Sequence, residues 1–372
     1  MTEAEFDAQE STSDDSESSE RSGGSKLKYQ DSSTYSADLE SQTPSAGVEL
    51  EYEAETVPSD ESALAVSVDV EDWYHVPAVT GSSFSEYEDV HEFFDEWDDE
   101  YDYLTEPTHR TLDLFDDLDI TATFFVVADV VDNYPGLVEE IAARGHEIGC
   151  HGLHHECAID PDTKEPRFTR DEYRKQIKTA KRKLEDATGQ EVVGFRAPNA
   201  YVSGWVLDVL EELGFEYDSS VARSSLYNKT DQKLDQVGTT PYIPSQGSLD
   251  PAPDYDRDIV ELPWPYYKFL LGEIPTAGGP LIRLFGRRVV QAGVEQSLER
   301  GDSVFYFHPI DIARASFPKV GNMKRRPMYW AFKGKTAERR VRKLLNSMPD
   351  DRLTDCYTVA KQYEYDITHI NK

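Results

Sequence analysis

The sequence predicts an α/β fold, and more specifically an irregular (β/α) barrel. Apolar strands alternate with amphipathic helices from residue 63 onward, an order that favours a mainly parallel sheet. No G-x-G-x-x-G follows the first strand, so an open dinucleotide-binding fold is disfavoured. Polar side chains directly follow successive apolar strands, and in parallel α/β folds the chemistry collects at those strand ends.

The first 62 residues differ in composition from the rest of the chain. Through Glu61 they contain 17 acidic and three basic residues, with almost no apolar periodicity. Such a segment cannot bury enough surface to offset its ordering entropy, so residues 1–62 are predicted to be a disordered acidic tail. Residues 63–372 are predicted to form one folded domain, with a core at 64–311 and a C-terminal extension at 312–372.

Charge and cysteine content restrict the class of protein. The chain has 72 acidic and 38 basic residues, a formal net charge of −34. This charge argues against nucleic-acid binding and is typical of proteins from salt-loving organisms. Three cysteines (Cys150, Cys157 and Cys356) do not suggest a disulfide framework. We find no signal peptide and no apolar run long enough to span a membrane, so we expect a cytoplasmic protein.

Each element has a local signal. The apolar run ALAVSVDV predicts the first strand, and Thr169, Glu172 and Gly189 predict a capped helix that ends at Thr188. The predicted strands are 63–70, 121–127, 146–150, 192–195, 215–217, 259–262 and 303–307. The predicted helices are 108–118, 134–144, 169–188, 203–213 and 288–299, with part of 86–106 and a basic helix near 339–343.

Histidines gather in the stretch GHEIGCHGLHHE, residues 145–156. His151 and His155 lie four residues apart after a short apolar strand, a spacing that allows both rings to bind one metal ion. Three carboxylates, Asp69, Glu71 and Asp72, end the first strand. Acids are costly at the end of an apolar strand unless they are solvated or functional.

Three further strands end in Arg196, Asp218 and His308. Two histidines and one carboxylate are a common hydrolytic site for a divalent ion. A second carboxylate can serve as general base, and a distant histidine as general acid. An arginine can orient the base and keep it ionised. Together these residues predict metal-assisted hydrolysis of an amide or ester.

Six segments in this order, VSVDVEDW, TATFFVV, RGHEIGCHGLHHE, GFRAPN, GFEYDSS and VFYFHP, resemble the polysaccharide deacetylases of carbohydrate esterase family four. Segments AGGPLIRLF, FHPIDI and TAERRVRKLL resemble the branch associated with exopolysaccharide synthesis, and the acidity suggests a halophilic archaeon. The resemblance implies a distorted (β/α) barrel of the deacetylase type and a divalent metal, usually zinc. It also implies removal of acetyl groups from an N-acetylated sugar or polysaccharide intermediate, which would be the partner.

The resemblance assigns roles to residues by position. His151 and His155 match the metal-binding pair, Asp69 the general base and His308 the acid that protonates the leaving amine. Arg196 and Pro198 match the Arg-x-Pro motif, which implies an oxyanion contact from the backbone N–H of Asn199. Phe305 and Phe307 would line the pocket for the acetyl methyl. Asp218 falls where the family has a supporting aspartate, but its local motif matches less well than the others. Trp73 is a further candidate for substrate contact.

The first-strand motif departs from the family pattern. Val70 occupies the position of the second of two adjacent aspartates, the one that binds metal. The ligand must therefore be Glu71 or Asp72. Glu71 shares a strand face with Asp69, whereas Asp72 requires a turn of the chain but has the shorter reach, and we prefer Asp72 slightly.

Two alternatives to the deacetylase remain open because of this departure. The first is an allantoinase-like hydrolase that opens cyclic amides on the same barrel. The second is an inactive barrel that only binds carbohydrate. The sequence does not predict the sugar, the metal or the oligomeric state.

Overall fold

A computed structural model describes residues 62–82, 84–97, 102–253, 257–318, 320 and 329–370. The predicted disordered tail, residues 1–62, therefore lies outside the described residues except for its last position. Within the described part, the fold confirms the predicted parallel α/β barrel. Its central sheet has the strand order β10-β1-β2-β3-β4-β5-β6, and β9 also pairs with β1.

All of the pairings in this sheet are parallel, and the sheet curls without closing. β1 is the central strand because it pairs with β2, β9 and β10. In the described ranges β6 and β9 do not pair, so the barrel is incomplete. The strands are β1 (Leu64–Val70), β2 (Thr123–Val126), β3 (Glu147–Cys150), β4 (Gly194–Phe195), β5 (Tyr217–Asp218), β6 (Val260–Glu261), β9 (Ser303–Phe307) and β10 (Leu353–Thr354).

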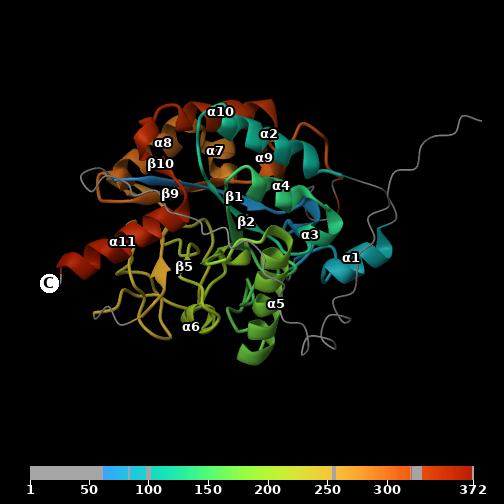
Figure 1. Ribbon diagram of the computed structural model, residues 1–372, viewed down its shortest axis with the longest axis horizontal. Helices are drawn as coiled ribbons and strands as arrows, with labels where there is room; N and C mark the ends of the chain where they lie inside the picture. The colour runs from blue at the N-terminus through green and yellow to red at the C-terminus, as the bar shows by residue number, and fades with distance from the viewer. Residues whose placement is uncertain are drawn as a thin grey trace, which may run out of the picture.

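Helices cover both sides of the curled sheet (Figure 1). Helices α5 and α6 lie on one side, and α2, α7, α8 and α10 lie on the other. The helices are α1 (Val90–Glu96), α2 (Thr105–Asp116), α3 (Val130–Asn133), α4 (Leu137–Ala143), α5 (Arg170–Thr188), α6 (Gly204–Glu212), α7 (Gly279–Phe285), α8 (Arg287–Leu298), α9 (Pro309–Ile312), α10 (Lys335–Leu345) and α11 (Cys356–Ile370).

Local sequence signals explain where several helices begin and end. Thr169 and Glu172 form the predicted capping box at the start of α5, and Gly189 ends the helix in the left-handed conformation. None of the described helices is both long enough and apolar enough to pass through a membrane.

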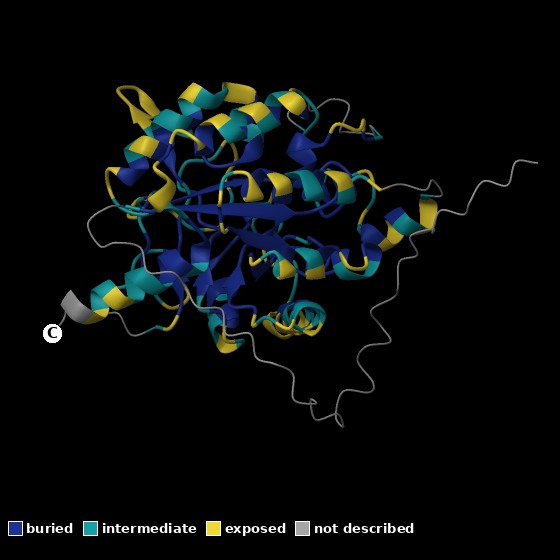
Figure 2. Cartoon of the chain, turned by 45° about the horizontal axis from the view of Figure 1, so that its top comes forward, coloured by how far each residue is buried: buried dark blue, intermediate teal, exposed yellow. Residues whose placement is uncertain are grey.

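Burial follows the layers of the fold (Figure 2). The strands are dark blue in the centre, and the helices expose only their outer faces. All seven residues of β1 are buried, including the polar Ser67 and Asp69. Since β1 is buried on both faces, its polar side chains must find partners inside the barrel.

Candidate active site

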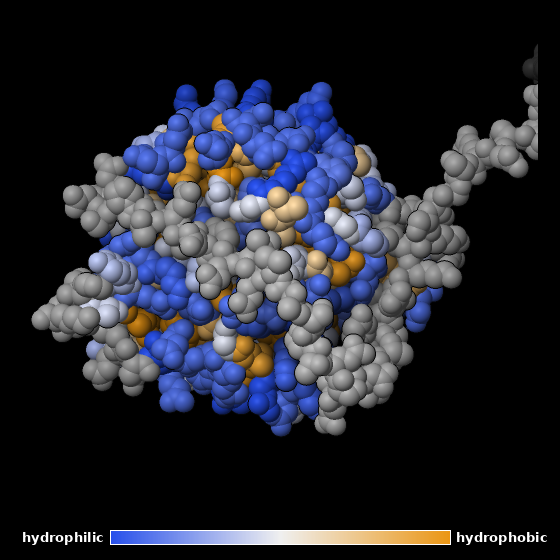
Figure 3. All heavy atoms as spheres, in the orientation of Figure 1, coloured by the Kyte–Doolittle hydropathy of each residue, from blue (hydrophilic) through white to orange (hydrophobic). Residues whose placement is uncertain are grey.

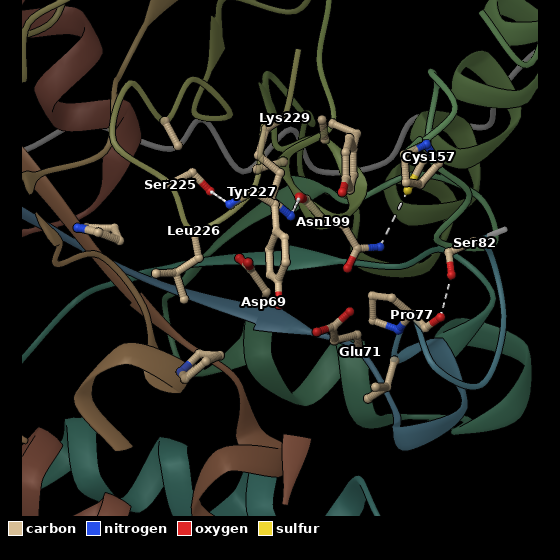
Figure 4. Close-up of a pocket in the computed structure, with 18 of the residues that line it drawn as sticks. Asp69, Glu71, Pro77, Ser82, Cys157, Asn199, Ser225, Leu226, Tyr227 and Lys229 are labelled. Atoms are coloured by element: carbon tan, nitrogen blue, oxygen red, sulfur yellow. Dashed lines mark hydrogen bonds between the residues drawn. The ribbon is translucent and has the colours of Figure 1, made fainter. Parts of the chain in front are cut away.

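The side chains of Asp69 and Glu71 line a cavity of about 390 Å³. They lie two residues apart at the end of β1, so strand alternation directs both to the same face. In Figure 4 both point toward a wall that contains Asn199, Tyr227 and Lys229. The carboxyl end of the central strand is therefore the floor of the cavity.

Glu71, His151 and His155 form a candidate metal centre. Each offers one ligand atom, and these three atoms lie within 4.8 Å of one another. All three side chains are buried. Two imidazoles and one carboxylate are a set that suits Zn²⁺ and leaves coordination positions for substrate and water.

Backbone carbonyls fix the tautomer of both histidines. His151 Nδ1 lies 2.7 Å from the carbonyl oxygen of Arg196, and His155 Nδ1 lies 3.0 Å from that of His75. A carbonyl can only accept, so Nδ1 carries the hydrogen on each ring and Nε2 carries the lone pair. Burial also lowers the pKa of His151 to about 4, which keeps this ring neutral near pH 7.

Glu71 shows why a cation fits between these groups. Its Oε2 lies 2.7 Å from Nε2 of His155, yet that buried oxygen receives no hydrogen bond. With Nδ1 of His155 protonated, two lone pairs face each other at this contact. A divalent ion would relieve that repulsion, so the residues fit the metal that the resemblance implies.

The preference for Asp72 as the carboxylate ligand is wrong. Its side chain turns away from the cavity, accepts from the N–H of Trp73 at 2.7 Å and begins the short helix η2 (Trp73–His75). Tyr134 also donates to it. The chain turns at Asp72 into η2, so this side chain points away from the two histidines whatever its length. Glu71 stays on the same face as Asp69.

Arg196 holds Asp69 in position. Its Nη1 donates to Asp69 Oδ1 at 2.6 Å and to Ser67 Oγ at 2.9 Å, and its guanidinium is fully buried. The remaining donors bind the carbonyl and hydroxyl oxygens of Ser219 at 2.9 Å. These contacts hold the guanidinium against Oδ1 of Asp69, a residue that lines the cavity.

His308 reaches the same carboxylates from the end of β9. Its Nε2 lies 3.0 Å from Glu71 Oε1 and 4.0 Å from Asp69 Oδ2. Its Nδ1 lies 2.9 Å from Oδ2 of Asp311. Burial alone lowers the pKa of His308, but Glu71 and Asp311 raise it well above the ordinary value. The two carboxylates therefore favour the protonated form of this ring.

Asp311 is a functional candidate that the sequence reasoning missed. Besides His308 Nδ1, its carboxylate accepts from the backbone N–H of His308 at 2.9 Å, and Arg283 Nε lies 2.8 Å from Oδ1. Asp311 and Arg283 are each 3% exposed. The sequence HPID, which runs from His308 to Asp311, already indicated this contact. An acidic side chain three residues after a helix N-cap can accept a hydrogen bond from the N-cap backbone N–H.

The turn after Arg196 brings Asn199 into the cavity wall. Asn199 has φ of 55° and Ala200 has φ of 58°, both in the left-handed region. Lys229 Nζ donates to the carbonyl of Asn199 at 2.9 Å (Figure 4). Pro198 does not line the cavity but packs over Gly152, so its predicted substrate contact is wrong and it shapes the turn instead.

Asp218 lies behind the cavity rather than in it. It accepts from Ser220 Oγ at 2.6 Å, and Ser220 Oγ in turn accepts from the N–H of Ala197. Burial and the neighbouring Glu261 favour a shared proton, with the pKa of Glu261 raised well above its ordinary value. The predicted catalytic role of Asp218 is not supported, because the side chain supports the Arg196–Asn199 turn from outside.

Three predicted aromatic contacts also point away from the cavity. Phe305 and Phe307 lie in the main core, where Phe307 meets Phe115 at 6.0 Å between ring centroids. Trp73 packs against Phe93 and Trp97 at 5.3 and 5.2 Å. The residue of β9 that does line the cavity is Tyr306, because it shares a strand face with His308.

Family models match two separate segments of the chain. Residues 94–217 match the model described as polysaccharide deacetylase, and residues 234–358 match a domain of unknown function. The first segment contains His151, His155 and Arg196, and the second contains His308 and Asp311. Residues of both segments meet in the single cavity described above.

Curated relatives agree with the first match. Peptidoglycan-N-acetylmuramic acid deacetylase PdaA of Bacillus subtilis is 30% identical over 110 residues, 29% of this chain and 39% of that protein. Peptidoglycan deacetylase of Helicobacter pylori is 26% identical over 173 residues, 42% of this chain and 52% of that protein. The matches thus span about two fifths to one half of these relatives. Together with the family model they support a polysaccharide deacetylase domain in this chain.

Solved structures share the fold. A crystal structure from Mycobacterium smegmatis, classed with the polysaccharide deacetylases, has 21% identity and a TM-score of 0.53, covering 85% of this chain and 96% of that chain. The Puue allantoinase has 13% identity and a TM-score of 0.50, covering 82% of this chain and 91% of the other. At these identities the likeness concerns the barrel alone.

Proposed function

We propose that this protein is a metal-dependent hydrolase that removes the acetyl group from an N-acetylated amino sugar or a polysaccharide intermediate. The observation that carries the proposal is the convergence of two ligand histidines, Glu71, an arginine-held Asp69 and an acid-type His308 on one cavity. The family model and the deacetylases among the relatives support the same chemistry.

Each side chain has a role in this reaction. Asp69, oriented by Arg196, takes a proton from the water that attacks the acetyl carbonyl carbon. The backbone N–H of Asn199 stabilises the oxyanion. His308 then donates its Nε2 proton to the leaving nitrogen as the C–N bond breaks, which yields acetate and a free amine. Glu71, His151 and His155 would hold a divalent ion, which would supply Lewis acidity toward the carbonyl and the water.

The sugar, the metal and the setting belong to the proposal. We favour zinc, because of the histidine ligands, and an N-acetylhexosamine unit as substrate. We keep the exopolysaccharide branch, the halophilic archaeal origin and a cytoplasmic location as proposals. Three free, buried cysteines are compatible with a reducing compartment.

Acetate release tests the proposal. Full-length protein supplied with Zn²⁺ should release acetate from N-acetylglucosamine oligomers, and Asp69→Asn should lower kcat by about 10²- to 10⁴-fold. Asp171→Asn, an exposed change on α5, is the matched control and should retain full activity. Ring opening of allantoin without acetate release would favour the allantoinase-like alternative. Sugar binding with no turnover of any N-acetylated substrate would favour the inactive barrel.

A further inference from the structure

A hairpin that borders the cavity through its last residue, Pro275, has an exposed apolar tip. β7 (Tyr266–Phe269) and β8 (Gly272–Pro275) form a two-stranded antiparallel hairpin, in which Phe269 pairs with Gly272. The two turn residues between them, Leu270 and Leu271, are 98% and 88% exposed. Tight hairpin turns favour Gly, Asn and Asp, so nothing in the turn geometry calls for two leucines. Their exposure needs a different explanation.

More large apolar side chains reach the surface on the neighbouring helices. Leu284 and Phe285, at the end of α7, are 36% and 40% exposed, and Phe332, just before α10, is 59% exposed. With Phe269 at 40%, six of the nine exposed large hydrophobic residues in the described part of the chain belong to this region. Such clustering marks an interaction surface rather than scattered exposure.

Contacts between these elements join the residues into one surface. Lys268 of the hairpin exchanges two hydrogen bonds with Gln296 of α8, at 2.7 and 3.1 Å. Arg340 of α10 donates to the carbonyl of Ile282 on α7 at 3.0 Å. The guanidinium of Arg340 also lies 5.8 Å from the ring centroid of Phe332. The hairpin, α7, α8 and α10 therefore pack together as one group of neighbouring elements.

This face is basic in an acidic protein. Besides the buried Arg283, helices α7, α8 and α10 contain seven basic and two acidic residues, whereas the whole chain has a net charge of −34. Among the described residues, Arg288, Lys335, Arg339 and Lys343 are exposed cations without a carboxylate partner. Figure 3 shows strongly hydrophilic atoms over α10 that border hydrophobic atoms over α7 and α8.

The residues of this apolar–basic face are defined in two sets. The apolar set is Phe269, Leu270, Leu271, Leu284, Phe285 and Phe332. The basic set is Arg288, Lys335, Arg339 and Lys343.

We propose that the apolar–basic face docks on an anionic lipid bilayer. The free energy falls when exposed leucine and phenylalanine side chains move from water into the acyl boundary. Lysine and arginine side chains beside them attract the anionic headgroups. Long basic side chains can keep their charge at the headgroups while the apolar tip inserts. Charge complementarity selects an anionic bilayer over a neutral one.

The docked orientation has a consequence for the cavity. Pro275, at the end of β8, and Pro280 and Leu281 of α7 line the cavity wall. The β7–β8 hairpin and α7 also carry five of the six residues of the apolar set, so two elements of the proposed docking face border the cavity. Lipid binding itself does not rest on the proposed deacetylase activity and can be measured without it.

Vesicle flotation at low salt tests the proposal with the full-length protein. We expect it to float with vesicles of phosphatidylglycerol and phosphatidylcholine and to stay behind with pure phosphatidylcholine. Leu270→Ser/Leu271→Ser should weaken binding at least tenfold, because two almost fully exposed leucines lose their insertion. Arg288→Gln/Arg339→Gln should weaken it by about fivefold per cation. Rising salt should weaken binding of the parent protein.

A matched control and a second measurement make the test specific. Arg174→Gln/Arg182→Gln removes two cations from α5, on the other side of the sheet, and should leave flotation unchanged. The proposal would be overturned if Arg288→Gln/Arg339→Gln and Arg174→Gln/Arg182→Gln lost vesicle binding equally. It would also be overturned if the parent did not float with anionic vesicles. Sedimentation of the parent as a dimer that Leu270→Ser/Leu271→Ser converts to monomer, without vesicle binding, would instead make this face a protein interface.

Discussion

The histidine tautomers are the most informative feature at the scale of single residues. Carbonyl oxygens of Arg196 and His75 hold Nδ1 of His151 and His155, so Nε2 carries the lone pair on both rings, and Nε2 of His155 lies 2.7 Å from Glu71 Oε2. The carbonyl of Arg196 thus orients the candidate ligand His151, while its guanidinium orients the proposed base Asp69. Arg196 therefore links the candidate metal centre to Asp69.

Asp311 should act through His308. Asp311→Asn removes the negative charge that holds the His308 ring by Nδ1, so we expect kcat to fall about ten- to a hundredfold with KM nearly unchanged. Steady-state acetate release measures both constants, and Asp350→Asn, an exposed change, is the control. An unchanged kcat would show that Asp311 is not needed to position the acid.

His146 should make stability depend on pH. Burial lowers its pKa to about 4, against an ordinary 6.5, since the ring packs 4.9 Å from Phe124. The folded state therefore holds the neutral ring. The stability from this depressed pKa is present above pH 6.5 and is lost as pH falls toward 4.

The variant His146→Leu lacks this titration. Between pH 7 and pH 4, the unfolding free energy of the parent should fall by about 3 kcal/mol more than that of His146→Leu. Urea unfolding at several pH values measures both, and only the difference in pH dependence matters. Parallel pH curves for the two proteins would contradict the assignment.

At the scale of elements, β9 shows what periodicity can and cannot predict. Its bounds, Ser303–Phe307, were predicted from the apolar run, but the choice of Phe305 and Phe307 for the cavity was wrong. His308 ends the strand in the cavity, and alternation then requires Tyr306 on that face. The same period-two rule favours Glu71 over Asp72. Both corrections follow from strand geometry that the sequence already contained.

The local sequence of β7, β8 and β10 does not indicate that these segments form strands. The β7–β8 hairpin has two leucines at its turn instead of turn-forming residues, so residues 266–275 were not predicted as strands. β10 is two residues long and forms only because Leu353 and Thr354 pair with β1 far away in sequence. Long-range pairing of this kind cannot be read from local pattern.

Gly279 should be essential to the α7–α9 contact. A Cβ at this position would collide with Oδ2 of Asp311 and lie 3.1 Å from Cβ of Phe307. Gly279→Ala must therefore push Asp311 away from His308, and we expect kcat to fall at least tenfold along with a lower melting temperature. Gly238→Ala, with no neighbour closer than 4.0 Å, is the control. Full activity of Gly279→Ala would contradict this packing role.

At the scale of the whole molecule, one site is assembled from distant parts of the chain. The proposed base Asp69 and the candidate ligand Glu71 lie at the end of β1, the histidine pair follows β3, and the proposed acid His308 follows β9. Sequence could predict this convergence because the carboxyl ends of parallel strands meet at one edge. It could not predict the Asp311–Arg283 pair or the exposed apolar–basic face, which depend on how α7, α9 and α10 pack together.

Metal content tests the central claim, that Glu71 with His151 and His155 forms the metal centre. After dialysis against buffer with Zn²⁺ and then metal-free buffer, the parent and Asp72→Asn should each retain about one ion per chain. Glu71→Gln and His151→Ala/His155→Ala should retain almost none, with circular dichroism confirming that they fold. Loss of metal in Asp72→Asn but not in Glu71→Gln, or no metal in the parent, would contradict the account.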